Sequence, residues 1–582
     1  MGEYVPKRYS QREYITGFDG SFGYAVVTKE QALLWTDGRY HLQASKQLES
    51  PPWTLMKFGQ ADVPTAEKWL VDNLEKNAVV GFDPWTFSVE QFKKFEEALN
   101  ARKKSCLKLL GVDNLVDIVW QQDQENPMPP LPTEPIFLHP TKYAGQSVPE
   151  KLQKLASDMK DERVDRILLT ALDDIAWLLN LRGSDVSFNP VFIAYCIATT
   201  EGTATLFVDD TKLSAEVREH LAAVDVAIKP YEAVCEALQS TAQGEVEYSY
   251  DPAQCNHKLF EFLDTNPVVE CSGRTSLATI AKGVKNEVEL QGMKKCHLRD
   301  AAALIRYLKW LEDRVSAGDV VTEVSGAEKL FQFRKQQDLF VSPSFETISS
   351  VGSNAAIIHY RPASGDNRQI TANDIYLLDS GAQYWDGTTD VTRTVHFGQP
   401  TAKQIECFTL VLKGHLALRY AVFPNTITGH QIDSWARSHL WQAGLDYKHG
   451  TGHGVGCFLN VHEGPHGIGT RPVPAKLKAG SIISNEPGYY EDGEFGIRIE
   501  NLCYLHEVET KYSMASTKFL GVDDLTMVPI QSKLVDVQLL TDKELDAFNK
   551  YHSEVLKRVG PLVEDDAALY DWLKCACQPL CK

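Results

Sequence analysis

Four acidic residues and one histidine in the last third of the chain have the types expected of a two-metal site. They are Asp379 and Asp390 in LLDSGAQYWDGTTDVTRT, His453 in HGTGHGVG, Glu486 in NEPGYY and Glu500 in GIRIEN. Four carboxylates crowded into a dry site repel one another and cannot all stay ionised. Two divalent cations would balance about four negative charges and could acidify a shared water. The residue types therefore suggest a hydrolytic metal centre.

The first two acids are predicted to meet through a β-hairpin. Asp379 closes the apolar run 375–378, which reads as a buried strand, and Asp390 opens a strand over Val391–His396. The turn Trp385-Asp386-Gly387 lies between them and would return Asp390 to the side of Asp379. Asp386 itself is interpreted as the turn residue.

The last two acids are each predicted at a strand, Glu486 at the end of one and Glu500 within another. Glu486 follows Ile482-Ile483 and precedes a Pro-Gly pair, so a strand should end where its side chain can face a cavity. Glu500 and Arg498 alternate along a predicted strand over Phe495–Leu505, and both should project from the same face.

The donor set is hard oxygen with one imidazole, which suits Mn²⁺ better than a thiolate-bound structural zinc. Taken singly, each acid is more often a solvated or ion-paired carboxylate than a ligand. The neighbouring sequence words are needed to carry the hypothesis further.

The composition is that of an acidic globular protein. The chain has 582 residues, 43% hydrophobic and 24% charged, and a formal net charge of −19. Such a charge argues against nucleic acid or an anionic membrane as a partner. Singly scattered cysteines and the lack of a leader or membrane-spanning run favour a cytoplasmic protein. The tail cysteines Cys575, Cys577 and Cys581 are expected to be unpaired thiols at a frayed end.

Three domains are expected: 1–125, an N-terminal α/β domain; 126–284, a second α/β domain of related topology; and 285–582. The connector Asn126–Pro135 holds five prolines, which cannot sustain helix or sheet. The third domain opens with a helix predicted over Glu287–Trp310 and then alternates helices with strand-rich stretches. This pattern indicates an α+β fold.

Two helix starts carry capping signals. Ser147 with Glu150 predicts a helix to about residue 161, and Ser325 with Glu328 predicts another capping box. Helices are also predicted near Ala402–Val422 and His430–Gly444.

Five segments, WTDGRY, NLRGSDV, DSGAQYWDGTTDVTRT, HGTGHGVGCFLNVHEGP and EPGYYEDGEFGIRIEN, carry a family resemblance. Together they resemble the cytosolic, three-domain type of aminopeptidase P, the X-Pro aminopeptidase branch of the pita-bread metallopeptidases. The resemblance covers nearly the whole chain. It implies two creatinase-like α/β N-terminal domains followed by a pita-bread catalytic domain.

The resemblance also implies a role for each metal-type residue. Asp390 and Glu500 match ligands that bridge two divalent ions, and Mn²⁺ is the expected metal. Asp379 would complete one ion, and His453 with Glu486 would complete the other. A hydroxide between the ions would be the nucleophile that attacks the peptide carbonyl.

Three histidines match the active-site histidines of the family: His359, His449 and His462. They would bind the scissile carbonyl or pass a proton to the leaving nitrogen, with Glu486 as the base for the attacking water. The alternatives are a satisfied core histidine for His359 and a supporting role for His449.

Three further residues match substrate-contacting or supporting positions. Tyr490 and Arg498 would support the site, although Arg498 could instead neutralise Glu500. Arg39 of WTDGRY would contact the peptide substrate, and its alternative is a turn arginine paired with Asp37.

The expected substrates are peptides with proline in second position, and the expected assembly is a homodimer. Prolidase, methionine aminopeptidase and a metal-free pita-bread binding protein remain as alternatives. Family members usually carry a leading strand and helix before the part resembling GEYVPKRYSQREYITGFDGS. The shorter start here is compatible with a first domain that lacks its first element.

Overall fold

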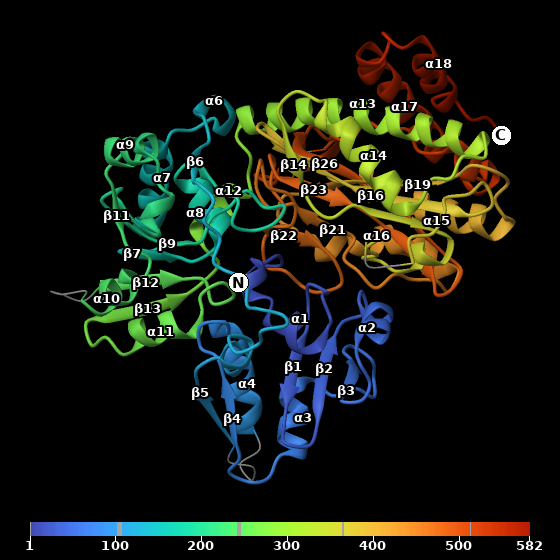
Figure 1. Ribbon diagram of the computed structural model, residues 1–582. Coiled ribbons are helices and arrows are strands. Elements are labelled where there is room, and N and C mark those ends of the chain that lie inside the picture. The colour runs from blue at the N-terminus through green and yellow to red at the C-terminus, as the bar shows by residue number, and fades with distance from the viewer. Residues whose placement is uncertain (1, 102–106, 241–245, 364–365, 513) are drawn as a thin grey trace. The chain divides into compact units, whose positions relative to one another are not determined.

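The computed structural model describes residues 2–101, 107–240, 246–363, 366–512 and 514–582. The chain folds into two compact units (Figure 1). The first contains residues 1–141 and 146–282, and the second contains residues 142–145 and 283–582. None of the helices described here is both long and apolar enough to cross a membrane.

The first unit begins with two small sheets. One contains β1 (Tyr24–Val27), β2 (Ala32–Thr36) and β3 (Trp53–Lys57), and the other contains β4 (Val79–Phe82) and β5 (Lys108–Gly111). The helices around them are α1 (Gln11–Thr16), α2 (His41–Gln47), α3 (Ala66–Asn73), α4 (Val89–Ala101) and α5 (Leu115–Trp120). β1 runs antiparallel to β2, and β3 runs parallel to it.

The remaining part of the first unit contains a six-stranded sheet. Its order is β11 (Val226–Lys229), β10 (Ala204–Val208), β9 (Ala194–Thr199), β7 (Arg166–Leu169), β12 (Val246–Tyr250) and β13 (Val269–Gly273). A short pair joins β6 (Phe137–Leu138) to β8 (Leu181–Arg182). The helices of this part are α7 (Val148–Asp161), α8 (Leu172–Leu178), α9 (Ala215–Ala223), α10 (Ala233–Gln239), α11 (His257–Asp264) and α12 (Leu277–Lys282), and α6 (Thr141–Ala144) precedes them in the chain.

The second unit is built on antiparallel sheets. A six-stranded sheet has the order β20 (Val422–Pro424), β27 (Phe519–Asp524), β26 (Asn501–Val508), β23 (Ile482–Asn485), β21 (Gly452–Gly454) and β22 (Glu463–Ile468). Two three-stranded sheets contain β15 (Ile348–Val351), β16 (Ile375–Ser380) and β19 (Val391–His396), and β14 (Phe340–Pro343), β17 (Ala382–Tyr384) and β18 (Gly387–Thr388). β24 (Gly488–Glu491) pairs with β25 (Phe495–Arg498).

Six helices surround these strands: α13 (Glu287–Ser316), α14 (Glu323–Lys335), α15 (Ala402–Arg419), α16 (His430–Gln442), α17 (Asp542–Val559) and α18 (Ala567–Ala576). Figure 1 shows the strands of this unit between α13 on one side and α15 and α16 on the other. Leu304 of α13, Leu412 of α15 and Val555 of α17 share one buried cluster with strand residues Tyr376 and Ile497. Burial of this apolar surface is the main stabilising contribution to the unit.

Most of the predicted elements are confirmed. The Ser147–Glu150 capping box and the helices after 401 and 429 are present. The helix predicted over Glu287–Trp310 is longer and ends at Ser316. The boundaries predicted at 125/126 and 284/285 stay predictions.

The capping box predicted at Ser325 and Glu328 is wrong. Helix α14 is capped by Thr322, whose hydroxyl accepts from the backbone N–H of Ser325, and Ser325 returns a bond to the backbone of Thr322. The helix therefore starts one turn earlier than predicted. The earlier start places Glu323 in the first turn, where its carboxylate is fully buried.

The continuous strand predicted over Phe495–Leu505 is also wrong. β25 ends at Arg498 and β26 begins at Asn501, because the chain changes sheets between them. The backbone N–H of Ile499 donates to Pro487 O, whereas that of Glu500 donates to Thr392 O of β19. Glu500 thus lies at the junction of two sheets.

The C-terminus is not frayed as predicted. Cys575 is part of α18, and Cys577 is buried in the same core cluster as residues of α17. Asn549 exchanges two hydrogen bonds with the backbone of Leu580. Cys575 and Cys581 are exposed free thiols, as predicted.

Candidate metal centre

The structure brings the five predicted ligands together in the second unit. Their possible ligand atoms fall into overlapping groups, within each of which all atoms lie within 4.8 Å of one another. One group contains Asp379, Asp390 and Glu500, and another contains His453, Glu486 and Glu500. A third contains Asp390, His453 and His462. Glu500 belongs to both carboxylate-rich groups, which is the arrangement that a bridging ligand requires.

Asp379 and Asp390 approach from neighbouring strands. Asp379 lies on β16, where it pairs with Thr392 of β19, and Asp390 immediately precedes β19. The intervening turn is formed by the short strands β17 and β18, so the predicted return of the chain is confirmed. Asp379 Oδ1 and Asp390 Oδ1 are buried and have no hydrogen-bond partner among the residues that the structure describes.

His453 and Glu486 are held by one serine. The hydroxyl of Ser484 on β23 accepts from the backbone N–H of His453 at 2.9 Å and donates to Glu486 Oε1 at 3.0 Å. His453 Nε2 lies 3.4 Å from Glu486 Oε1 and 3.5 Å from Asp390 Oδ2. Its other ring nitrogen contacts Gly454 O at 2.9 Å, which leaves Nε2 facing the carboxylates.

The glycines around His453 let β21 come close to its neighbours. A Cβ atom on Gly452 would lie 2.0 Å from Ser484 O, and one on Gly454 would lie 2.3 Å from Glu463 O. Any side chain at either position would push the strands apart. The HGTGHGVG segment therefore supplies the close packing that places His453 beside β23.

Glu500 is fixed by Thr392. The Thr392 hydroxyl donates to Glu500 Oε2 at 2.8 Å and accepts from Arg498 Nε at 3.1 Å. Arg498 Nη2 donates to Asp379 Oδ2 at 2.6 Å. The direct ion pair of Arg498 is therefore with Asp379, while its charge also lowers the pKa of Glu500. The alternative that Arg498 neutralises Glu500 stays open.

The electrostatics of the carboxylates match the expectation from crowding. Burial, followed by the neighbouring charges of Asp390 and Glu486, raises the pKa of Asp379 to about 7, although Arg498 opposes the rise. Burial and the same kind of repulsion raise the pKa of Glu500 well above its usual range. Burial also raises the pKa of Glu486, against the charges of His453 and Arg498. Positive charge is needed to ionise all four acids together.

These features fit a pair of divalent cations. The donor atoms are oxygens and imidazole nitrogens, two buried carboxylate oxygens lack partners among the described residues, and Glu500 is common to two groups. Such a donor set suits Mn²⁺ or a similar hard ion.

A buried polar chain leads from the acids to His449. Arg498 Nη1 donates to the Tyr490 hydroxyl at 2.6 Å, and this hydroxyl lies 2.9 Å from His449 Nε2. His449 Nδ1 contacts Gly450 O at 2.7 Å and lies 3.8 Å from Glu486 Oε2. Burial, then the charge of Arg498, lowers the pKa of His449 well below its usual range. His449 is thus neutral at pH 7 and can accept the Tyr490 proton in a hydrogen bond.

The other two histidines lie at the same site. The ring of His462, which is exposed and precedes β22, stands 4.3 Å from that of His453 in an edge-to-face contact. His359 is half-buried in the segment after the 3₁₀ turn Gly352–Ala356. Its positive charge, when present, lowers the pKa of His449, which places the two imidazoles within electrostatic reach.

The segment that carries His359 is held by a buried carboxylate. Glu323 Oε1 accepts from the backbone N–H of Val351 at 2.7 Å, and Glu323 Oε2 accepts from the Tyr360 hydroxyl at 2.7 Å and the backbone N–H of Arg368 at 2.9 Å. Asn354 Nδ2 lies 3.1 Å from both oxygens. These donors come from both sides of His359.

Arg39 belongs to the first unit. It forms two bonds to Asp37, from Nε to Oδ1 at 3.0 Å and from Nη2 to Oδ2 at 2.9 Å. This is the turn pairing that was the alternative interpretation. Contact of Arg39 with substrate stays a prediction.

The sequence analysis missed three supporting residues: Ser484, Thr392 and Glu323. Strand alternation could have found Thr392, because it lies two residues after Asp390 and shares its face. Ser484 could have been found in the same way, because it lies two residues before Glu486. No local signal links Glu323 to His359, since their contact depends on the tertiary fold.

Comparison with known proteins identifies the parts of the chain. Residues 291–507 match the metallopeptidase family M24, and residues 518–580 match the C-terminal region of peptidase M24. Residues 4–119 and 127–289 each match the creatinase/prolidase N-terminal domain. The predicted fold, with two such domains before a catalytic domain, is confirmed.

Proteins that match this chain over nearly its full length are described as aminopeptidases. Aminopeptidase P2 of Arabidopsis thaliana is 44% identical, with 100% of this chain and 85% of the relative covered. A probable Xaa-Pro aminopeptidase P of Sordaria macrospora is 46% identical, with coverages of 98% and 93%. The crystal structure of X-prolyl aminopeptidase from Caenorhabditis elegans, described as a cytosolic enzyme with a di-nuclear active site, matches with a TM-score of 0.93 and 40% identity over 100% of this chain and 93% of that one. The chain therefore belongs to the aminopeptidase P family of M24 metallopeptidases.

Proposed function

We propose that this protein is an Xaa-Pro aminopeptidase that releases the N-terminal residue from peptides with proline in second position. The observation that carries the proposal is the convergence of its acids into two groups that share Glu500. Membership of the aminopeptidase P family supports the same reaction.

Two divalent cations would be held by Asp379, Asp390, His453, Glu486 and Glu500, with Asp390 and Glu500 each belonging to two of the groups of possible ligand atoms. When bound, such ions acidify water and polarise a carbonyl group. Mn²⁺ is the proposed metal, because the donor set is mainly carboxylate oxygen.

The chain's own side chains would then orient the substrate and move protons. Glu486 is the proposed base for the attacking water, since its Oε2 lies on the side of His449. His359 and His462 would bind the scissile carbonyl or protonate the leaving nitrogen. His449, Tyr490 and Arg498 form a connected buried chain that keeps the imidazole neutral and fixed.

Selectivity for proline follows from the chemistry of the bond. An X-Pro bond has no amide N–H, and its φ angle is fixed near −65°, so sites that bind an extended backbone handle it poorly. A centre that engages only the carbonyl oxygen and the free amine does not need that N–H. We further propose that the enzyme works in the cytosol as a homodimer.

The test compares Arg-Pro-Pro, Arg-Pro and Arg-Ala-Ala with the full-length protein, with Mn²⁺ and after chelation. We expect hydrolysis of Arg-Pro-Pro, little of Arg-Ala-Ala, loss on chelation and recovery with Mn²⁺. Cleavage of Arg-Pro while Arg-Pro-Pro stays intact would indicate a prolidase instead. Failure of every divalent ion to restore hydrolysis would indicate a binding protein.

A further inference from the structure

Two buried asparagines stand directly behind the metal-type carboxylates. Asn485 precedes Glu486 and Asn501 follows Glu500, and the two asparagines are register partners on β23 and β26. Both side chains are completely buried. Successive residues of an extended chain point to opposite faces, so these amides point away from the carboxylates. The amide of Asn485 contacts α15.

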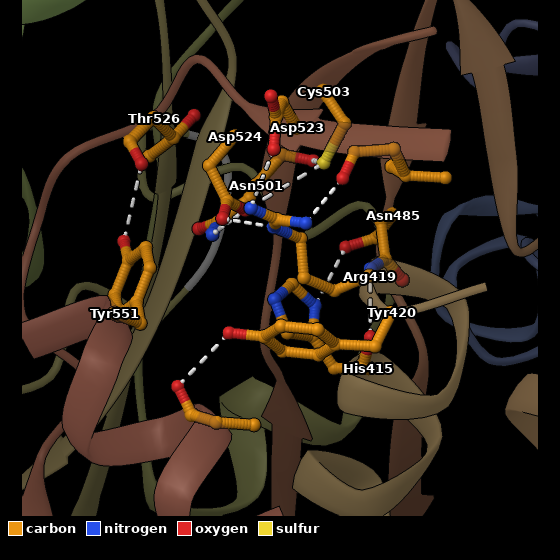
Figure 2. A network of polar contacts seen from close by, with 12 residues as sticks. His415, Arg419, Tyr420, Asn485, Asn501, Cys503, Asp523, Asp524, Thr526 and Tyr551 are labelled. Atoms are coloured by element: carbon orange, nitrogen blue, oxygen red, sulfur yellow. Dashed lines mark hydrogen bonds and ion pairs between the residues drawn. The ribbon is translucent and has the colours of Figure 1, made fainter. Parts of the chain in front are cut away.

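Helix α15 contacts the first asparagine twice, once at its side chain and once at its backbone carbonyl. Asn485 Nδ2 donates to the backbone carbonyl of His415 at 2.9 Å, and His415 Nδ1 lies 3.1 Å from Asn485 O. The imidazole of His415 is also buried. The backbone just before Glu486 is therefore fixed to the last turns of α15 (Figure 2).

The second asparagine is tied to the same helix through an aspartate. Asn501 Nδ2 donates to Asp524 Oδ1 at 2.9 Å, and Asp524 Oδ2 pairs closely with Arg419 Nε at the end of α15. Figure 2 shows Asn501, Asp524 and Arg419 in one connected network with His415 and Asn485 nearby. Arg419 Nη2 makes a separate bond of 2.9 Å to the more exposed Asp523.

A buried arginine extends this network to Glu500 itself. Arg393 Nη2 donates to Asn501 Oδ1 at 2.7 Å, and Arg393 Nη1 donates to the backbone carbonyl of Glu500 at 2.7 Å. Arg393 Nη2 also lies 2.9 Å from the Tyr551 hydroxyl on α17. The Asn501 amide thus has an acceptor on one side and a donor on the other, which leaves it a single orientation.

We propose that Asn485, Asn501, Asp524, Arg419 and His415, here called the asparagine clamp, position Glu486 and Glu500 for two cations. The inference rests on the proposed function, because it concerns how the same site binds metal. The acids of the site repel one another, so their backbones must be restrained from the opposite face. Outer partners of this kind commonly change metal affinity by about 10- to 100-fold when they are altered.

The chain offers a matched pair of variants. Asp524→Asn removes the charge that joins Asn501 to Arg419 without a change of volume. Asp523→Asn makes the same chemical change one residue earlier, at a carboxylate that also pairs with Arg419 but lies half-exposed. Titration of each metal-free protein with Mn²⁺, followed by electron paramagnetic resonance, reports free, single and exchange-coupled manganese.

The wild type is expected to bind two Mn²⁺ and to show the coupled signal. Asp524→Asn should weaken the second Mn²⁺ by about 10- to 100-fold and show single-ion signal at two equivalents. Asp523→Asn should change that affinity by less than about fivefold, as for a half-exposed ion pair. Equal affinities in Asp524→Asn and Asp523→Asn would overturn the clamp, whereas a wild type that binds no Mn²⁺ would overturn the proposed function.

A second pair of variants covers the case in which Asp524→Asn fails to fold. His415→Leu removes the ring N–H directed at Asn485 O, and His415→Gln supplies an amide N–H at a similar reach. We expect His415→Leu to weaken the second Mn²⁺ at least about tenfold and His415→Gln to recover most of that loss. A loss of the same size in both variants would show that packing alone is responsible and would also overturn the clamp.

Discussion

Glu323→Gln tests whether a residue far from the metal-type ligands acts through His359. Glu323 is fully buried, and its two oxygens accept from the backbone N–H groups of Val351 and Arg368, the Tyr360 hydroxyl and the Asn354 amide. The substitution keeps the side-chain volume but replaces one acceptor by an NH₂ group. Every neighbour of that group is arranged to donate.

The free-energy cost of the substitution is estimated for the orientation of the new amide that costs less. With NH₂ at the position of Oε1, the N–H of Val351 loses its acceptor, whereas Asn354 can still bond to the remaining oxygen. The new amide hydrogens also face this donor. Two unsatisfied buried groups at about 1–3 kcal/mol each give a cost of about 2–6 kcal/mol. The segment that holds His359 should therefore open or shift.

The assay is a double-mutant cycle on the hydrolysis of Arg-Pro-Pro. Glu323→Gln should lower kcat at least about tenfold, and by no more than the about 10²- to 10⁴-fold that a catalytic acid or base contributes. In a His359→Ala background the same change should have little further effect, since the two residues act as one unit. Glu328→Gln, at an exposed position of the same helix, is the control and should leave kcat unchanged. Independent, multiplicative losses in the double variant would refute the coupling of Glu323 to His359.

Two further predictions concern the acids themselves. Glu486→Gln should lower kcat by at least about 10²-fold. The melting temperature of the metal-free protein should stay the same or rise, because one of four repelling charges is removed. Retained X-Pro hydrolysis would contradict the assignment of Glu486. Mn²⁺ binding should release protons near pH 7: the pKa of Asp379 is about 7 and that of Glu500 is raised, so the metal-free site holds protons that a cation must displace. Affinity should then increase as the pH rises through 7, and heats of binding that are the same in buffers of different ionisation enthalpy would contradict this.

The sequence could locate Asp379, Asp390 and Glu486 because each of them lies at the edge of a short apolar run. Ile375–Leu378 reads as a buried strand, and the acid after it must then face the interior or the sheet edge. The convergence of β16, β19, β23 and the 499–500 junction could not be read in this way. It depends on pairings between strands more than a hundred residues apart, such as Glu500 N–H with Thr392 O.

The two local errors share a physical cause. Alternation predicted one strand through Glu500, yet the backbone there changes partner from β24 to β19. Ser and Thr are both good helix caps, so the local pattern could not choose between Thr322 and Ser325. Burial of the Glu323 carboxylate against the His359 segment favours the earlier start. In both cases a tertiary contact of the site overrides the local preference.

Backbone hydrogen bonds that do not depend on the charges of the acids hold the acids of the site together. The N–H of Glu486 bonds to Thr451 O, that of Glu500 to Thr392 O, and that of His453 to the Ser484 hydroxyl. Arg498 supplies the one buried cationic side chain paired with a ligand in the described part of the centre. Against four carboxylates this leaves an excess of negative charge, which the raised pKa values express as retained protons. Cations bound here would displace these protons, so metal affinity should depend on the residues that fix the backbone as well as on the ligands.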